Sequence, residues 1–411
     1  MERVILTTGG TGGHIFPALA IAEEIRGRWP KAMILFMGGQ YGQEADIAVK
    51  AGLDFVGLPV RGVMGRGLRG IPAAIGMGRG VLRALGIIRK TRPDLVVGFG
   101  GYAAFAGVLA GRLSGTVTAV HEQNSFPGMT NRLLGRWVDR VFLSMPDRSG
   151  VFSQDKTVLV GNPVRAGIAA LYEKGARFET PASAPAGKSY YGGVDGPSPF
   201  DVKDGKREDA APVPEEPATE EPAQARAPRL LVMGGSQGAR AINDGMIAAI
   251  LPLLEAGVEI WHQCGQADFE RVRAAYRDAK AEHVRVEPFI VDMPRAYEWA
   301  DLIFCRAGAS TLAEITAAGL PSVLAPFPQA AQNHQFYNAR FLEEEEAAVV
   351  LEQSRFTGPG SDASLPARLL LELLQDKARR HEMSVRSFRL ARPYAARDLV
   401  NELEILLQNR K

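Results

Sequence analysis

The segment from Gly308 to Ala339 combines a glycine turn, a helix pattern, a short apolar strand and a polar cluster. Gly308 to Thr311 can present backbone N–H groups at the start of a helix, where unpaired donors and the helix dipole favour phosphate. Glu314 follows about one helical turn later, where its carboxylate can accept hydrogen bonds from ribose hydroxyls. We therefore expect a nucleotide at this segment.

Neutral polar side chains follow the predicted strand from Ser322 to Ala325. They are His334, Gln335 and Asn338. Imidazole and amide groups can donate and accept hydrogen bonds, which suits the hydroxyls of a sugar. Contacts to phosphate, ribose and sugar in one segment predict a nucleotide-sugar donor site.

A glycine-rich loop from Gly9 to Gly13 follows the first predicted strand, and His14 comes directly after it. The loop lacks both the G-x-G-x-x-G spacing of dinucleotide sites and the lysine of a P-loop. Without side chains, its backbone is open to a bulky phosphorylated or lipid-linked substrate. The positive end of the next helix would lower the pKa of His14 and favour its neutral, proton-accepting form. Two roles stay open for His14, a general base and a structural side chain.

The chain reads as two similar halves. Each half begins with a short apolar strand, a glycine loop and an apolar helix, the strands being Val4 to Thr7 and Leu230 to Met233. Strands that alternate with helices predict two doubly wound α/β domains with parallel sheets. Ligands of such sheets bind at the carboxyl ends of the strands. Glycine turns are expected there, two in each half, and they indicate a phosphorylated ligand held between the domains.

Polar residues also cluster after the predicted strand from Val117 to Val120. His121, Glu122 and Asn124 belong to this cluster, which either lines a site or caps a helix and stays structural. Arg165 ends the motif Gly161 to Arg165, near the predicted exit from the first half. Its guanidinium would either meet a diphosphate or form a surface ion pair.

Composition narrows the class of protein. The 411 residues are 46% hydrophobic and 23% charged, and a net charge of +2 does not indicate a nucleic-acid binder. Two separated cysteines, Cys264 and Cys305, predict neither a disulfide framework nor a zinc site. We expect no signal peptide, no membrane-spanning helix, and no protein-held metal or other cofactor. The stretch from Arg177 to Pro228 is rich in Pro, Ala and acidic residues and is predicted to be a disordered insert.

A basic, apolar stretch without Asp or Glu extends from Phe55 to Pro93. Such a segment can lie on an anionic membrane, with its cations at the headgroups. The alternative is an amphipathic core helix with solvated arginines. The candidate membrane contacts are Arg69, Ile71, Ile75, Arg79, Leu82 and Arg83.

The ordered set of motifs resembles glycosyltransferase family 28, and specifically its bacterial transferases that act on lipid I, undecaprenyl-diphospho-MurNAc-pentapeptide. The motifs are Thr8 to His14 with Phe16 to Ala20, Gly98 to Tyr102, His121 to Asn124, Gly161 to Arg165, Gly234 to Arg240 and Cys305 to Ala339. They cover the chain outside the insert. The insert itself, and His334 where some relatives have glutamine, depart from the family pattern.

The resemblance implies a GT-B fold, with two Rossmann-like domains facing a cleft. The domains would be residues 1–165, which face the acceptor and membrane, and 229–394, which bind UDP-GlcNAc. Residues 166–228 would form the linker, and residues 395–411 a helix that returns to the first domain. The implied reaction is inverting transfer of GlcNAc from UDP-GlcNAc to the muramoyl 4-hydroxyl of lipid I, which gives lipid II and UDP for peptidoglycan synthesis.

The resemblance also assigns roles to single residues. Glu314 would hold the ribose, Ile290 the uracil, and Ser236 with Arg165 the diphosphate. The GlcNAc would be surrounded by Asn124, His334, Gln335 and Asn338. His14 would be the base, and the phosphate and acceptor loops would contain Thr11, Gly12, Gly13, Gly100, Gly101 and Tyr102.

A peripheral position on the cytoplasmic face of the bacterial inner membrane follows from a lipid-bound acceptor, and cell-wall synthesis or division proteins are possible partners. Two alternatives stay open. One is a UDP-GlcNAc 2-epimerase or another GT-B transferase that shares the donor half. The other is a non-catalytic protein of the membrane surface that retains the nucleotide fold.

Overall fold

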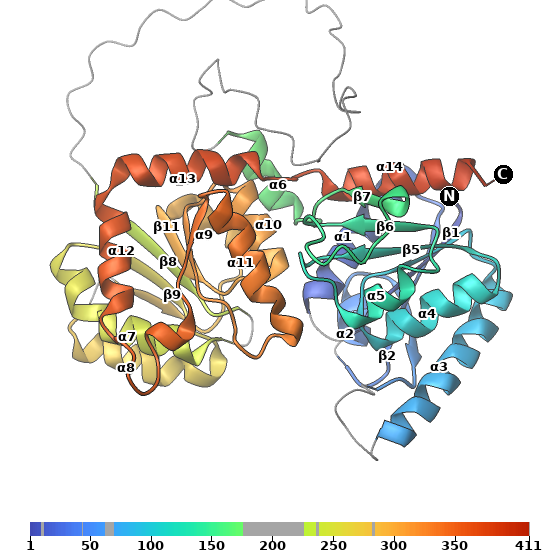
Figure 1. The fold of residues 1–411 in the computed structure, drawn as a ribbon, viewed down its shortest axis with the longest axis horizontal. Coiled ribbons are helices and arrows are strands. Elements are labelled where there is room, and N and C mark those ends of the chain that lie inside the picture. The colour runs from blue at the N-terminus through green and yellow to red at the C-terminus, as the bar shows by residue number, and fades with distance from the viewer. Residues whose placement is uncertain are drawn as a thin grey trace, which may run out of the picture. The chain divides into compact units, whose positions relative to one another are not determined.

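The computed structural model describes residues 1–9, 12–42, 44–61, 70–175, 226–235, 238–281 and 284–410, with the side chains of 70–73 excepted (Figure 1). Nearly all of the predicted insert lies outside these ranges. Thr11, Ser236 and Arg69 also lie outside them, as does the side chain of Ile71.

The first half forms a parallel sheet with the strand order β3-β2-β1-β4-β5-β6-β7 within the described residues. Its apolar strands are short and largely buried, which is typical of a sheet covered on both faces. The strands are β1 Arg3–Thr7, β2 Met33–Gly39, β3 Asp54–Leu58, β4 Leu95–Gly98, β5 Val117–Glu122, β6 Arg140–Leu143 and β7 Thr157–Leu159. The helices are α1 Gly12–Arg28, α2 Glu44–Lys50, α3 Gly70–Thr91, α4 Gly101–Leu113 and α5 Met129–Leu134. Helix α6 Ala166–Glu173 follows, and its Ile168 and Leu171 are buried in a core of the second half.

The second half repeats this plan, with the strand order β10-β9-β8-β11-β12-β13. The strands are β8 Arg229–Met233, β9 Glu259–Gln263, β10 Arg285–Glu287, β11 Leu302–Cys305, β12 Ser322–Leu324 and β13 Ala348–Val350. The helices are α7 Arg240–Glu255, α8 Phe269–Asp278, α9 Met293–Trp299, α10 Ala309–Ala317, α11 His334–Glu344, α12 Leu365–Gln375, α13 Lys377–Arg389 and α14 Ala395–Gln408.

Alternation along the central strands divides each half into two cores. In β1, Val4 and Leu6 face one core while Ile5 faces the other. In β8, Leu231 and Met233 join one core, and Leu230 and Val232 join the second. This period of two is expected for strands whose faces are both covered by helices. It confirms the predicted pair of doubly wound α/β domains.

Helix α14 packs on the first half, although it ends the chain. Leu399 and Leu403 are fully buried in the same core as Val4 of β1. Arg28 of α1 donates from Nη1 to Asn401 Oδ1 at 2.5 Å and from Nη2 to the Arg397 carbonyl at 3.1 Å. The final helix therefore supplies part of the first half's core.

Two predicted boundaries were wrong in ways that affect the site. Helix α1 begins at Gly12, so Gly12 and Gly13 belong to its first turn and are not loop residues, while His14 lies at the start of the helix as predicted. Strand β5 continues to Glu122, so His121 and Glu122 are buried strand residues and do not follow the strand. Strand β5 continues because its backbone groups stay paired with β6 as far as Glu122.

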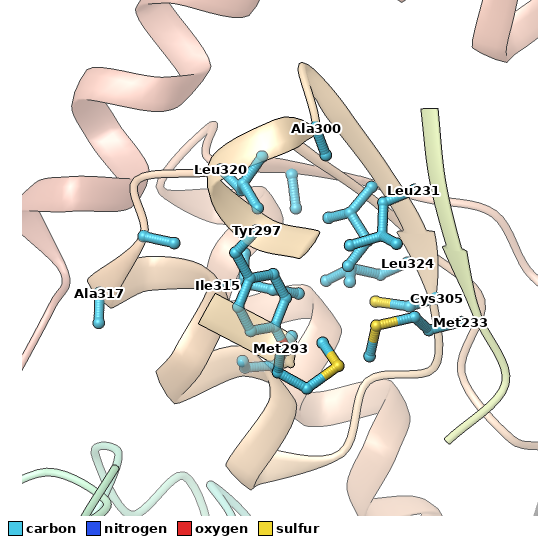
Figure 2. Close-up of a cluster of buried hydrophobic side chains, with 14 of the residues drawn as sticks. Leu231, Met233, Met293, Tyr297, Ala300, Cys305, Ile315, Ala317, Leu320 and Leu324 are labelled. Atoms are coloured by element: carbon cyan, nitrogen blue, oxygen red, sulfur yellow. The ribbon is translucent and has the colours of Figure 1, made fainter. Parts of the chain in front are cut away.

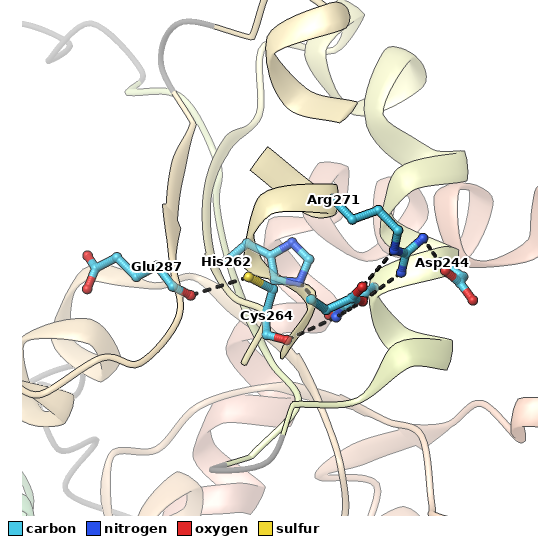
Figure 3. A network of polar contacts seen from close by, with 7 residues as sticks. Asp244, His262, Cys264, Arg271 and Glu287 are labelled. Atoms are coloured by element: carbon cyan, nitrogen blue, oxygen red, sulfur yellow. Dashed lines mark hydrogen bonds and ion pairs between the residues drawn. The ribbon is translucent and has the colours of Figure 1, made fainter. Parts of the chain in front are cut away.

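A buried polar network lies between α7 and β9 (Figure 3). Tyr276 donates to His262 Nδ1, and His262 Nε2 donates to Asn243 Oδ1, both at 3.1 Å. Asn243 then donates to the Cys264 carbonyl at 3.0 Å and to Asp268. Burial lowers the pKa of His262 to about 3, so its ring stays neutral. This network is a structural feature of the second half.

No helix of the described chain is long and apolar enough to span a bilayer.

Candidate active site

The amino end of α10 is the first part of the site. Gly308 caps the helix with φ −70° and ψ 137°, an ordinary extended conformation. Among the described residues other than its two chain neighbours, a Cβ placed on Gly308 would have only Thr311 Oγ1 within 4 Å, at 3.8 Å. The first N–H groups of a helix have no partner inside it. The chain thus leaves space before these donors, as a phosphate site requires.

Glu314, one turn into α10, contacts residues from both halves. Its Oε1 accepts from Arg165 Nη2 at 2.9 Å and Nε at 3.1 Å, and its Oε2 accepts from the Tyr297 hydroxyl at 2.8 Å. The Glu314 side chain is 15% exposed and that of Arg165 is 49% exposed. Two residues predicted for the donor, 149 positions apart, therefore meet.

Asn338 of α11 makes a second connection between the halves. Its Oδ1 accepts from the Ser125 backbone N–H at 3.0 Å, and its Nδ2 donates to Asn124 Oδ1 at 3.1 Å and to the Ala307 carbonyl at 3.2 Å. The buried amide of Asn338 thus has partners on both atoms. Two predicted GlcNAc contacts, Asn124 and Asn338, are bonded to each other in this state.

Buried Glu122 fixes the loop that presents Asn124. Its Oε1 accepts from the Asn124 backbone N–H at 2.9 Å and from the Asn124 side chain at 3.1 Å. Its Oε2 accepts from the Gly128 N–H and from Asn131 Nδ2. Burial raises the pKa of Glu122, and these donors oppose that rise. The buried Glu122 carboxylate therefore fixes the orientation of Asn124.

A third connection joins Asn162 to α10. Asn162 Nδ2 donates to Ser310 Oγ at 3.2 Å. Asn162 is buried and lies three residues before Arg165, inside a motif noted from the sequence. The sequence predicted no role for the side chain of either residue, because their contact spans 148 positions.

His14 lies in the first turn of α1 with a defined orientation. Its Nδ1 is 3.1 Å from the Gly9 carbonyl oxygen. A carbonyl only accepts, so Nδ1 carries the proton and the neutral ring presents a bare lone pair at Nε2. The pKa of His14 is lowered, first by burial; the bond to Gly9 opposes this and the nearby His334 adds to it. The lower pKa was predicted, although from the helix dipole.

The glycines that start α4 pack against the Gly9 loop. Gly100 has φ 99° and Gly101 has φ 83°, and the Gly9 N–H donates to the Gly100 carbonyl at 3.0 Å. A Cβ on Gly101 would lie 2.2 Å from the Gly9 oxygen, and one on Gly100 would lie 3.0 Å from His14 Nε2. These glycines allow the chain to approach itself, and Tyr102 next to them is exposed.

His334 and Gln335 begin α11 after two residues in the left-handed region, Gln332 and Asn333, both with φ 55°. His334 Nδ1 donates to the Ala331 carbonyl at 2.8 Å, which leaves Nε2 as the acceptor of the neutral ring. Gln335 Oε1 accepts from the Phe327 N–H at 3.0 Å. Burial lowers the pKa of His334, so a neutral imidazole is expected at this predicted sugar contact.

The side chain of Ile290 belongs to the core, where it is 1% exposed, while Phe289 beside it is exposed. The Ile290 N–H donates to Gln263 Oε1 at 3.0 Å, and Gln263 Nε2 donates to the Gly235 carbonyl at 3.0 Å. Gln263 therefore ties the predicted base contact to the second glycine loop. No sequence pattern indicates this link, and the uracil role of Ile290 stays a prediction.

The predicted membrane residues that the structure describes share one surface of α3. Ile75 and Leu82 are 60% and 69% exposed, and Arg79 and Arg83 are also exposed. Their spacing places them along one face of the helix. Ala84 and Ile88, in contrast, are buried in the first half's core. Among the described residues, no three His, Cys, Asp or Glu side chains are grouped to hold a metal ion.

Comparisons with known proteins find the same family in both halves of the chain. Residues 4–143 match the sequence model of the glycosyltransferase family 28 N-terminal domain, and residues 229–399 match that of its C-terminal domain. A relative from Nitratidesulfovibrio vulgaris strain Miyazaki F is 53% identical, with 100% of this chain and 98% of the relative covered. Another, from Solidesulfovibrio magneticus, is 45% identical over 98% of this chain and 97% of its own. Both are named UDP-N-acetylglucosamine--N-acetylmuramyl-(pentapeptide) pyrophosphoryl-undecaprenol N-acetylglucosamine transferase.

Solved structures give the same result. The crystal structure of Acinetobacter baumannii MurG aligns with a TM-score of 0.73 and 28% identity, and covers 98% of this chain and 99% of that one. A UDP-N-acetylglucosamine 2-epimerase aligns with a TM-score of 0.62 at 16% identity, over 100% of this chain and 98% of its own, which is a likeness of fold alone. The predicted two-domain GT-B fold is confirmed. Matches in both halves, and along the full length of close relatives, show that the chain belongs to glycosyltransferase family 28.

Proposed function

We propose that this chain transfers GlcNAc from UDP-GlcNAc to the muramoyl 4-hydroxyl of lipid I, releasing UDP and forming lipid II for peptidoglycan synthesis. The meeting of Arg165 with Glu314 is the observation that carries the proposal, since it joins a cation and an acceptor from opposite halves beside an open helix start. Relatives that match the whole chain have names for this reaction.

The acceptor is activated by His14. Its bare Nε2 takes the proton of the 4-hydroxyl while that oxygen attacks C1 of GlcNAc. The O4–C1 bond forms as the bond from C1 to the β-phosphate oxygen breaks on the opposite face, and the configuration at C1 inverts. The bond from Nδ1 to Gly9 keeps the ring oriented during this transfer.

The departing diphosphate is stabilised by the N–H groups of α10 and by the guanidinium of Arg165. Arg165 must then exchange Glu314 for phosphate, and Glu314 receives the ribose hydroxyls. Asn124, Asn338, His334 and Gln335 provide the donors and acceptors around GlcNAc. No resident metal is needed in this scheme, and retention of activity in EDTA is its test.

Binding to an anionic membrane surface completes the proposal, because the acceptor carries a lipid. The exposed face of α3 supports it, with Ile75 and Leu82 available for insertion and Arg79 and Arg83 for headgroups. The cytoplasmic face of the inner membrane and contacts with cell-wall or division proteins stay predictions.

The first experiment measures UDP release from UDP-GlcNAc by the purified chain, with and without a lipid I analogue. Release that depends on the acceptor supports the transferase. Donor consumption without an acceptor would instead indicate an epimerase or a hydrolase. Binding of UDP without any turnover would contradict the acceptor assignment.

The membrane surface is tested separately on vesicles that contain an anionic phospholipid. Arg79→Glu with Arg83→Glu should reduce binding at least tenfold, at about 1 kcal/mol for each cation lost near the surface. Lys377→Glu with Arg389→Glu makes the same change in charge on exposed positions of α13 and should have little effect. Equal losses in both pairs would mean that net charge, and not the α3 face, controls binding.

A further inference from the structure

The hydroxyl of Tyr297 is a polar group inside an otherwise apolar core. Tyr297 lies on α9, is 0% exposed, and packs among side chains that include Met293, Ile315 and Leu320 (Figure 2). A buried hydroxyl requires a hydrogen-bonding partner. The partner is Glu314 Oε2, at 2.8 Å. A core side chain therefore reaches the carboxylate of the donor site.

The two oxygens of Glu314 have different surroundings. Oε2 faces the phenol, whereas Oε1 faces the half-exposed guanidinium of Arg165. Burial, and then the negative charge of Glu314, raise the pKa of Tyr297 well above its usual value. The phenol therefore keeps its proton and donates to the carboxylate. One oxygen is fixed from the core side, and the other stays available on the outer side.

We propose that Tyr297 is a positioning residue for nucleotide recognition, which holds Glu314 so that Oε1 is presented to the ribose hydroxyls. This inference rests on the ribose role of Glu314 in the proposed function. A glutamate side chain has several rotatable bonds, and fixing its carboxylate before binding removes an entropic cost. The ribose then replaces Arg165 at an oxygen that is already oriented.

A structural role alone makes a different prediction. If Tyr297 only fills the core, loss of its hydroxyl lowers stability but leaves the preference for a ribose unchanged. If Tyr297 positions Glu314, loss of its hydroxyl should weaken the preference for a nucleotide that carries ribose hydroxyls. The informative quantity is therefore the ratio of affinities for UDP and for 2′,3′-dideoxy-UDP, which lacks both hydroxyls.

The test is titration calorimetry of the full chain with both nucleotides. Glu314→Ala should reduce the affinity ratio about tenfold, the size expected for hydrogen bonds to a charged group. Tyr297→Phe should reduce it about threefold to tenfold, and raise KM for UDP-GlcNAc with kcat nearly unchanged. Tyr276→Phe removes an equally buried hydroxyl that bonds His262 and not Glu314, so the ratio should not change.

A second variant tests the same contact without altering the core. In Glu314→Gln the amide has one oxygen, and the phenol should hold that oxygen inward and turn the NH₂ group toward the ribose. The affinity ratio should then fall as far as in Glu314→Ala. In the double variant Tyr297→Phe with Glu314→Gln the amide can rotate, and part of the ratio should return.

The outcomes separate the two claims. A ratio unchanged by Glu314→Ala would remove the ribose role and the inference with it. A ratio changed by Glu314→Ala but not by Tyr297→Phe would overturn only the positioning role. Equal losses of affinity for both nucleotides in Tyr297→Phe would overturn it as well, since the hydroxyl would then serve the fold.

Discussion

Helices α4 and α10 start at the same topological place in the two halves, each after the fourth strand of its sheet, yet their amino ends differ. The start of α4 is closed by its own chain, with the Gly9 loop against Gly101 and the His14 ring against Gly100. The start of α10 is open within the described part of the chain, where a Cβ on Gly308 would meet only Thr311 Oγ1 beyond its two chain neighbours.

In the proposed function, this difference gives one fold plan, used twice, two roles. The covered start of α4 packs against an imidazole that is held in one tautomer. An open start can receive a phosphate and needs no base of its own. Under this proposal, the repeated topology places both sites, and the local packing around Gly100, Gly101 and Gly308 distinguishes them.

The largest expected effect is a loss of kcat when His14, which packs against the closed start of α4, is replaced. His14→Ala should lower kcat by about 10³-fold, within the range for loss of a general base. The affinity for UDP, measured by calorimetry, should not change, because the proposed nucleotide site lies at the start of α10. A kcat within a factor of a few of that of the unmodified enzyme would exclude His14 as the general base.

A matched pair of glycine substitutions tests the comparison directly. Gly100→Ala puts a methyl group 3.0 Å from His14 Nε2 at a backbone φ of 99°, so kcat should fall about 10²-fold. Gly308→Ala is unstrained at φ −70° but enters the predicted phosphate space, so KM for UDP-GlcNAc should rise about tenfold with kcat retained. Steady-state kinetics on both variants tests this. The same change in both variants, or a loss of kcat in Gly308→Ala with a rise of KM in Gly100→Ala, would contradict the difference between the two helix starts.

Arg165, from the first half, contacts Glu314 near the open start of α10. Arg165→Ala should weaken UDP binding about tenfold, because a charge-assisted contact to the diphosphate is lost. Arg148→Ala is the control, since Arg148 also pairs with a glutamate of the second half, Glu344, but has no predicted donor role. Similar losses in the two variants would mean that pairing between the halves, and not phosphate contact, sets the affinity.

The smallest effect is a displacement of the pH profile. Burial holds the pKa of His14 below its ordinary value of 6.5, so the imidazole stays neutral as the pH falls through 6.5 and protonates only at lower pH. The acid limb of kcat/KM should therefore have its midpoint below 6.5. An acid limb at or above 6.5 would show that a different group, or an exposed His14, controls activity.

The sequence predicted the repeated strand–loop–helix order, the parallel sheets and the segments that form the site, because buried strands and glycine turns are local signals. It did not predict which site residues bond each other. Asn338 was expected to face a sugar, yet its amide connects Asn124, Ser125 and Ala307. Tyr297 reads as an ordinary core aromatic, and only the packing of α9 against α10 brings its hydroxyl to Glu314.

Helix α14 has a consequence for how the protein is made. A ribosome completes the strands of the first half long before it reaches Leu399 and Leu403, which fill part of that half's core. Until then, apolar surface around β1 and α1 stays uncovered, and such surface promotes aggregation of unfinished chains. Closure of the first half therefore waits until α14 has been made, so a chain truncated before Leu399 should expose this surface and be removed by chaperones and proteases.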